Sequence, residues 1–224
     1  FNPKANITRA EVVKILDNAI GGFYHHTGTI TENASNIVIV NTGDVVLQDM
    51  TIQGDLILAE GIGDAVVTLD NVKVSGRVII RGGADTIVKG DSALPNVAFI
   101  KQDDSVTLKV EDNAEVTNVT VQEGSDDVTL TGEIESLSLV GSHVTVYAVD
   151  ATIDTAEVSG KNSRLVVDED STINQVTVTE TGTGATIEGD GDVKKATIEG
   201  NNVAIDTIGT KATVADGVKG TTNN

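Results

Sequence analysis

A short apolar pattern that returns about every 20 residues constrains this chain more than any other feature. The pattern, [V/I]-x-x-[apolar]-x-[apolar], is clearest at residues 116–121, 134–139, 153–158, 173–178 and 193–198. Its fourth position falls at residues 50, 72, 97, 119, 137, 156, 176 and 196, and a second strand is expected at Val128, Val144, Leu165, Ala185 and Val203. No helical pattern separates the units, and a β-propeller blade needs about twice this period. The repeat therefore predicts a β-solenoid, in which each unit stacks on the next.

The predicted fold is all-β, a right-handed parallel β-helix whose turns have about 20 residues each. With strands about 4.8 Å apart, eight or nine turns make a rod roughly 40 Å long. Hydrophobic residues make up 39% of the chain but aromatic residues only 2%, which suits a narrow core filled by Val, Ile, Leu and Ala. A repeated glycine is expected in tight bends with positive φ. It occurs at Gly54, Gly76, Gly124, Gly141, Gly160 and Gly200.

The first 22 residues follow a different pattern. Residues 1–20 have helical spacing, Thr8 is a good N-cap, and Glu11 completes a capping box. Gly21 is expected to end the helix. Because the open end of a solenoid needs cover, we expect this short α-helix to cap the first turn. The predicted organisation is a capping helix at 1–22, a parallel β-helix at 23–218 and a small, polar linker at 219–224.

The charge of the chain excludes several classes of partner. Its 15 Lys and Arg against 34 Asp and Glu give a formal net charge of −19. Such a surface repels phosphate backbones and anionic lipid, so neither nucleic acid nor membrane is an expected partner. The absence of cysteine excludes disulfides, a thiolate zinc site and a cysteine nucleophile. We expect a soluble monomer.

Residues 1–16, FNPKANITRAEVVKIL, resemble the closing part of an S-layer homology repeat. The signature of that family is F-x-P-x-x-x-I-T-R-A-E followed by an apolar helix, and residues 7–11 match it at every position. The resemblance implies a secreted protein on the surface of a Gram-positive bacterium, with a wall-polymer role for Arg9 and Glu11. Three complete repeats hold such proteins on the wall, so wall binding would need the missing repeats. The alternative assigns Glu11 to the capping box and Arg9 to solvent.

A β-helix of this size directly after such a tail is similar to the family 54 carbohydrate-binding module. That module lies between S-layer repeats and a family 16 catalytic domain in a clostridial cell-surface endo-β-1,3-glucanase (laminarinase). The similarity lies in domain order, size and Gly/Asp-punctuated turns such as residues 61–76. It implies non-catalytic binding of insoluble polysaccharides (β-1,3-glucan, xylan or chitin-like material) and structural calcium. It also implies a parent glycoside hydrolase that is secreted and displayed on the cell surface.

An aspartate column is the strongest candidate metal site. Asp150, Asp170 and Asp190 recur at intervals of 20 residues, and Asp168 and Asp192 flank them. Carboxylates about 5 Å apart on successive turns repel unless a cation or solvent intervenes, and Ca²⁺ favours oxygen ligands. We therefore predict structural calcium among these five residues. Asx turns that face water are the alternative.

Few residues offer the exposed rings on which sugars stack. The predicted carbohydrate-binding residues are Tyr147, which alternation places outward, its neighbour Thr145, and Tyr24 in the ring cluster at 23–26. Packing of the cluster against the helix explains Tyr24 equally well. A passive spacer without ligand is one alternative function. A β-helix lyase or hydrolase, for which Arg164 near Asp168 resembles a lyase base, is weaker, because turns this short leave few residues to wall a catalytic cleft.

Overall fold

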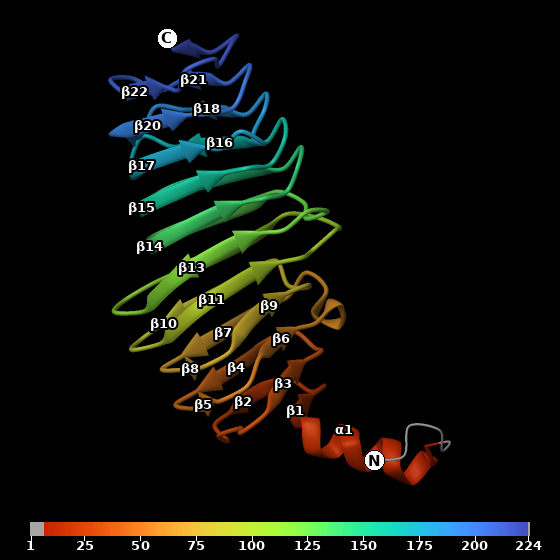
Figure 1. Cartoon of the computed structure of the whole chain (residues 1–224). Helices are drawn as coiled ribbons and strands as arrows, with labels where there is room; N and C mark the ends of the chain where they lie inside the picture. Colours follow the sequence, from red (N-terminus) through yellow and green to blue (C-terminus); the bar gives the residue numbers. More distant parts are fainter. Residues whose placement is uncertain (1–6, 224) are drawn as a thin grey trace.

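A computed structural model describes residues 7–223. The chain is 52% strand and 6% helix, and it forms a parallel β-solenoid of about 11 turns with one helix at its N-terminus (Figure 1). The solenoid predicted from the repeat is therefore confirmed, with more turns than the eight or nine expected. Residues 1–6 of the S-layer-like motif and residue 224 of the predicted linker lie outside the described residues.

Each turn contributes backbone to three columns of parallel pairing, which we call faces A, B and C. Face A consists of β1 (Ile20–Tyr24), β3 (Ile37–Val40), β6 (Leu56–Leu58), β9 (Arg77–Ile80), β20 (Lys195–Ile198), β22 (Lys211–Val214) and the last residues of β11 (Ala93–Phe99), β13 (Glu115–Val121), β14 (Val128–Leu139), β15 (Thr145–Val158) and β17 (Thr172–Val178). Face B consists of β2 (Gly28–Ile30), β4 (Val45–Gln48), β7 (Val66–Asp70), β10 (Asp85–Lys89), β12 (Val106–Val110), β16 (Arg164–Val167), β18 (Thr186–Glu188), β21 (Ala204–Asp206), β23 (Thr222–Asn223) and the first residues of β14 and β15. Face C consists of β5 (Thr51–Ile52), β8 (Lys73–Val74), β19 (Asp192–Val193) and the intervening parts of the long strands, and a short 3₁₀ helix, η1, spans Glu60–Ile62.

A row of stacked interior side chains on face A explains why the repeat folds this way. In register, the row runs through Val38, Leu56, Val78, Val97, Val119, Leu137, Ala156, Val176 and Ala196. Each is at most 3% exposed, and burying a Val or Leu side chain contributes about 1.5 to 3 kcal/mol. The predicted row is confirmed from Val97 onward.

The early part of the predicted row is wrong. Val78 and Leu56 align with Val97, whereas the predicted Val72 and Met50 lie beside β8 and β5 on face C. In the early turns the face A residue follows the aligned face C residue by four positions (Val74 to Val78) rather than three (Val116 to Val119), so a fixed pattern reaches the wrong strand. The second predicted strand needs a smaller correction. Its aligned residues are Val128, Val146, Leu165, Ile187 and Ile205, so that Val144, Ala185 and Val203 lie two residues early.

Close stacking of backbone, rather than positive φ, accounts for the repeated glycine. Of the six predicted glycines, all of them described, Gly124 alone has positive φ, at 80°. A Cβ atom on Gly160 would lie 2.1 Å from the carbonyl oxygen of Gly141 on the preceding turn. Glycine is therefore required there because two backbones approach too closely for a side chain.

Helix α1 (Arg9–Ala19) forms as predicted but does not cover the end of the solenoid. Thr8 and Glu11 make the capping box, and the helix then passes directly into β1 through Ile20, which is extended at φ −100°. Gly21 is thus part of a strand rather than a helix stop. No side chain of α1 is buried, and the helix projects from the end of the rod (Figure 1). The ring of Tyr24 packs against the core instead.

The C-terminal end differs from the prediction as well. Strand β23 (Thr222–Asn223) pairs with β21, and the backbone N–H of Lys219 donates to Asn201 Oδ1 at 2.9 Å. Residues 219–223 therefore continue the solenoid and are not a linker.

Candidate functional site

The three predicted sugar-binding residues occupy unlike positions. Tyr147 faces outward from face B, between Thr129 and Val166 of the adjacent turns, as alternation predicted. Thr145 is only 7% exposed, and its backbone N–H donates to Asp127 Oδ1 at 2.7 Å. This burial disfavours the predicted sugar contact, which stays a prediction.

Tyr24 also departs from the predicted role. It lies on the inward side of β1, and a Cβ atom on Gly22 would meet its ring and hydroxyl at 2.8 to 2.9 Å. Burial raises the pKa of Tyr24, and the charge of Glu32 adds to the effect. The ring thus lies over Gly22 at the end of the core, and its role in sugar binding stays a prediction.

The predicted calcium corner is built from hydrogen bonds within the chain. Asp168 accepts the N–H of Asp150 at 3.3 Å and the hydroxyl of Ser171 at 2.5 Å. Asp150 itself is left-handed at φ 48°, as an Asx turn allows. Asp170, Asp190 and Asp192 are exposed on the same corner. Within residues 7–223, no three Asp, Glu or His side chains converge as metal ligands would. Calcium binding here stays a prediction.

The S-layer-like residues are accounted for by the helix they begin. The Glu11 carboxylate accepts the N–H and the hydroxyl of Thr8, each at 2.8 Å, and these bonds hold the pKa of Glu11 below its usual value. Arg9 is the first helical residue and is exposed. A wall-polymer role for this pair stays a prediction.

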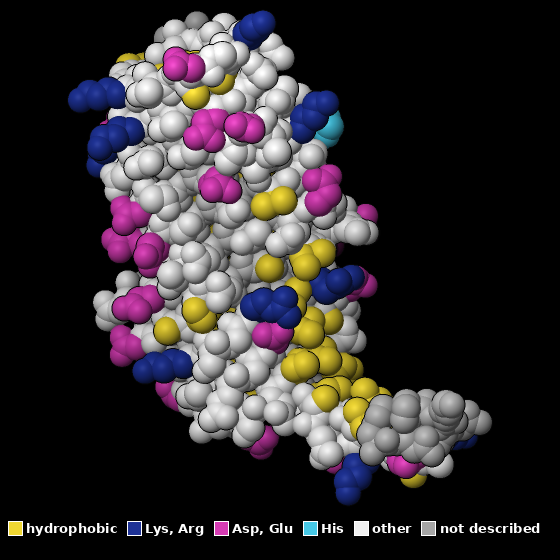
Figure 2. Space-filling model, viewed as in Figure 1, with side chains coloured by type: hydrophobic (Ala, Val, Ile, Leu, Met, Phe, Trp, Pro, Cys, Tyr) yellow, Lys and Arg dark blue, Asp and Glu magenta, His cyan; other side chains and the backbone are white. Residues whose placement is uncertain are grey.

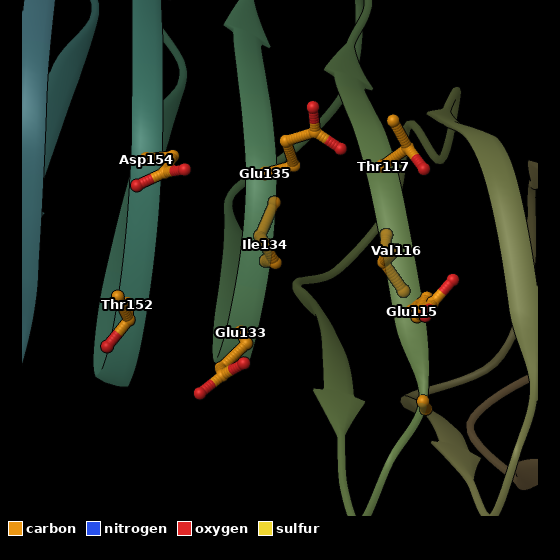
Figure 3. Close-up of a pocket in the computed structure, with 9 residues that line it drawn as sticks. Glu115, Val116, Thr117, Glu133, Ile134, Glu135, Thr152 and Asp154 are labelled. Carbon is orange, nitrogen blue, oxygen red and sulfur yellow. The ribbon is translucent and has the colours of Figure 1, made fainter.

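A groove lies where face C meets face A, on β13, β14 and β15 (Figure 3). It measures about 340 Å³, and we call it the acidic groove. Its lining residues are Ala114, Glu115, Val116, Thr117, Glu133, Ile134, Glu135, Thr152 and Asp154. It forms because the β13–β14 ladder begins at Asn118 and Ser136, so that residues 115–117 and 133–135 are not joined by ladder bonds.

Four carboxylates surround an apolar floor in this groove. Val116 and Ile134 are each 3% exposed, whereas Glu115, Glu133, Glu135 and Asp154 are all exposed. None of the five ion pairs formed within residues 7–223 involves these four carboxylates. The groove therefore offers acceptors for hydrogen-bond donors and repels anions.

A ladder of polar side chains fixes one wall of the acidic groove. Asn174 donates to Asp154 Oδ1 at 2.6 Å, and Lys194 donates to Asn174 Oδ1 at 2.7 Å. These three residues recur at steps of 20 along the sequence, and each belongs to a successive turn. The carboxylate of Asp154 is thereby oriented before any ligand arrives.

Reasoning from the sequence missed this groove, although a signal for it exists. Glu115 and Glu133 each stand immediately before the first apolar residue of a repeat unit, and Glu135 and Asp154 stand immediately after one. Because these two positions recur in each repeat unit, the residues at them stack on the same corner of the solenoid. The interruption of the ladder between β13 and β14, which opens the groove, has no comparable signal in the sequence.

The outer row of face A is the second notable surface. It runs through Phe23, Ile39, Ile57, Ile79, Ala98, Thr120, Ser138, Glu157, Thr177, Thr197 and Thr213. We call its first four members the apolar row. Figure 2 shows hydrophobic side chains gathered over the strands near the helix, in the same region.

Comparison with family models, with curated proteins and with solved structures found no match. Within residues 7–223, no helix is both long and apolar enough to span a bilayer.

Proposed function

We propose that the chain is a non-catalytic module that binds neutral, insoluble polysaccharide, and that the acidic groove is where a sugar chain lies. The observation that carries this proposal is the groove itself, with exposed carboxylates around a floor of buried Val116 and Ile134. Carboxylates form strong, charge-assisted hydrogen bonds with hydroxyl groups. Val116 and Ile134, each 3% exposed, close the groove beneath these carboxylates. Its volume of about 340 Å³ is at the small end of ligand sites, which run from about 300 to 1,000 Å³.

Binding suits the groove better than catalysis. A glycosidase needs a carboxylic acid sheltered from water to protonate the leaving group, and all four carboxylates are exposed. The resemblance of residues 7–16 to an S-layer repeat supports placing the module on a cell surface. The similarity in domain order and size to the family 54 module supports a parent glycoside hydrolase that degrades β-1,3-glucan.

Adsorption of the chain to insoluble polysaccharide tests the proposal directly. The chain is incubated with insoluble β-1,3-glucan, xylan, chitin and an anionic pectin, and the protein left in solution is measured. We expect adsorption to at least one neutral polymer and none to pectin. Glu133→Gln/Glu135→Gln is expected to weaken it at least about tenfold, because hydrogen bonds to charged groups contribute about 1.5 to 3 kcal/mol each.

The matched control is Glu169→Gln/Glu199→Gln, which removes the same charge from two exposed residues outside the groove. It should adsorb like the unmodified chain. Failure to adsorb to every neutral polymer would favour a passive spacer, for which the rod of about 11 turns is suited.

We also propose structural calcium at the corner of Asp150, Asp168, Asp170, Asp190 and Asp192. Two hydrogen bonds already occupy Asp168, so the exposed carboxylates beside it would supply the remaining oxygens. Calcium should raise the melting temperature more than Mg²⁺ at the same ionic strength, and Asp170→Asn/Asp190→Asn should abolish the difference. An unchanged melting temperature in EDTA and in calcium would exclude this site.

A further inference from the structure

Helix α1 has an apolar face that nothing described in the structure covers. Val12, Val13, Ile15 and Leu16 are between 39% and 64% exposed, and no side chain of this 11-residue helix is buried. Isolated helices shorter than about 12 to 15 residues are marginal in water, and helices in proteins gain most of their stability from packing an apolar face. A stable α1 therefore requires another surface that packs against its apolar face.

The exposed face continues onto the solenoid. A shallow hollow between α1 and β1 is lined by Val13, Leu16, Ile20 and Phe23 among others. Phe23 is 51% exposed and begins the apolar row of face A. The uncovered apolar surface thus extends from the helix across the first turns of the solenoid.

The charges on the helix match those of a second copy of the same helix. Arg9, Ala10, Val13, Lys14 and Asp17 line one side of α1. At 3.6 residues per turn, Arg9 and Asp17 stand roughly 40° to either side of Val13. When two copies pack antiparallel about Val13, Arg9 of one copy comes to the level of Asp17 of the other, and this happens at both ends of the contact.

Local charge also permits this pairing, although the whole chain carries −19. Arg9, Glu11, Lys14 and Asp17 are the charged residues of α1, and they sum to zero. At physiological salt, exposed charges farther apart than about 8 Å are largely screened. The helix is therefore a place where two such acidic molecules meet without strong repulsion.

We propose that the chain forms a two-fold symmetric dimer through antiparallel packing of α1 against α1, with Val13 and Leu16 at its centre and Arg9–Asp17 pairs at its two ends. Such a contact is isologous, since each copy contributes the same surface. This departs from the monomer expected from the sequence.

Sedimentation velocity of the whole 224-residue chain over a range of concentrations tests the dimer. We expect a reversible species of twice the 23.2 kDa chain mass. Val13→Glu/Leu16→Glu should abolish it. Ile208→Glu, which alters an 81% exposed residue in the C-terminal part of the chain, should leave it unchanged. If the chain is a monomer at every concentration, the proposal is wrong, even if another molecule covers the apolar face of α1.

Charge reversal tests the antiparallel register without touching the apolar face. Arg9→Asp and Asp17→Arg should each weaken the dimer several-fold, and the double reversal should restore it, because the two charges simply exchange places. Both changes favour the helix, since acidic residues suit its first turn and basic residues its last, so weakening is not unfolding; circular dichroism checks this. A dimer that tolerates Val13→Glu/Leu16→Glu, or single reversals that the double does not rescue, would refute this arrangement.

Discussion

The outer row of face A changes character halfway along the solenoid, whereas the interior row beside it does not. Near the helix the outer row is apolar, with Phe23, Ile39, Ile57 and Ile79, and beyond Ala98 it consists of Thr, Ser and Glu. The interior row is aliphatic throughout and at most 3% exposed from Val38 to Ala196. The interior therefore determines the fold, and the outer rows are free to differ from one turn to the next.

The largest expected effect contrasts one interior residue with its outward neighbour. Leu137 is fully buried, and Leu137→Ala should lower the free energy of unfolding by about 2 to 5 kcal/mol, because it leaves a cavity. Ser138 faces outward on the same strand, and Ser138→Ala should change it by at most about 0.5 kcal/mol. Urea unfolding measures both. Equal losses would mean that the two rows are not energetically distinct.

Two buried hydroxyls should respond with opposite signs. Thr86 is fully buried between Val67 and Leu108 and, within the described residues, its Oγ1 has no hydrogen-bond partner. Thr86→Val should stabilise the chain by about 1 kcal/mol, because it removes an unpaired polar atom at constant shape.

Ser92 is the matched control. It is 1% exposed, accepts the N–H of Val72 at 2.9 Å and donates to the Lys89 carbonyl at 2.7 Å. Ser92→Ala should lower the free energy of unfolding by about 1 to 3 kcal/mol, because it leaves the Val72 N–H unpaired. If thermal and urea unfolding show losses for both variants, the hydroxyl of Thr86 contributes to stability after all.

Exchanging the outer row itself is expected to affect stability less than Leu137→Ala does. Ile57→Thr/Ile79→Thr extends the polar part of the row toward the helix, and both residues are only partly buried. The free energy of unfolding should fall by less than about 2 kcal/mol in total, while fluorescence of a bound hydrophobic dye should fall markedly. Val78→Thr alters the buried residue next to Ile79 in β9 and should lower the free energy of unfolding much more, so it shows what a general loss of structure does to the dye signal.

The sequence predicted the parts of the molecule that depend on burial. The repeat located the interior row from Val97 onward, since an inward side chain must be apolar in every turn. It misplaced Met50 and Val72 because turn length is set by corners, where one extra residue is tolerated at little cost. It assigned α1 to the end of the solenoid because an amphipathic pattern reports that a face is apolar, not which surface covers it.

The candidate site was less accessible to prediction. Tyr147 was placed correctly by alternation, but the same alternation placed Thr145 outward, and Thr145 is only 7% exposed. The acidic groove arises where the β13–β14 ladder is interrupted, which depends on contacts between turns rather than on any one strand. Residues that stack on one corner can be found from the sequence, whereas the space between turns cannot.

The parallel ladders also determine how the molecule would bear a load. Its interstrand hydrogen bonds run along the rod, and each turn contacts its immediate neighbours, as in other solenoids. A force that pulls the two ends apart therefore loads these hydrogen bonds one turn at a time rather than all together. Opening would begin at whichever end turn is held less firmly and would release one turn of chain at each step. About 11 turns would thus unfold one after another, and the distance between the two ends of the chain would increase in steps.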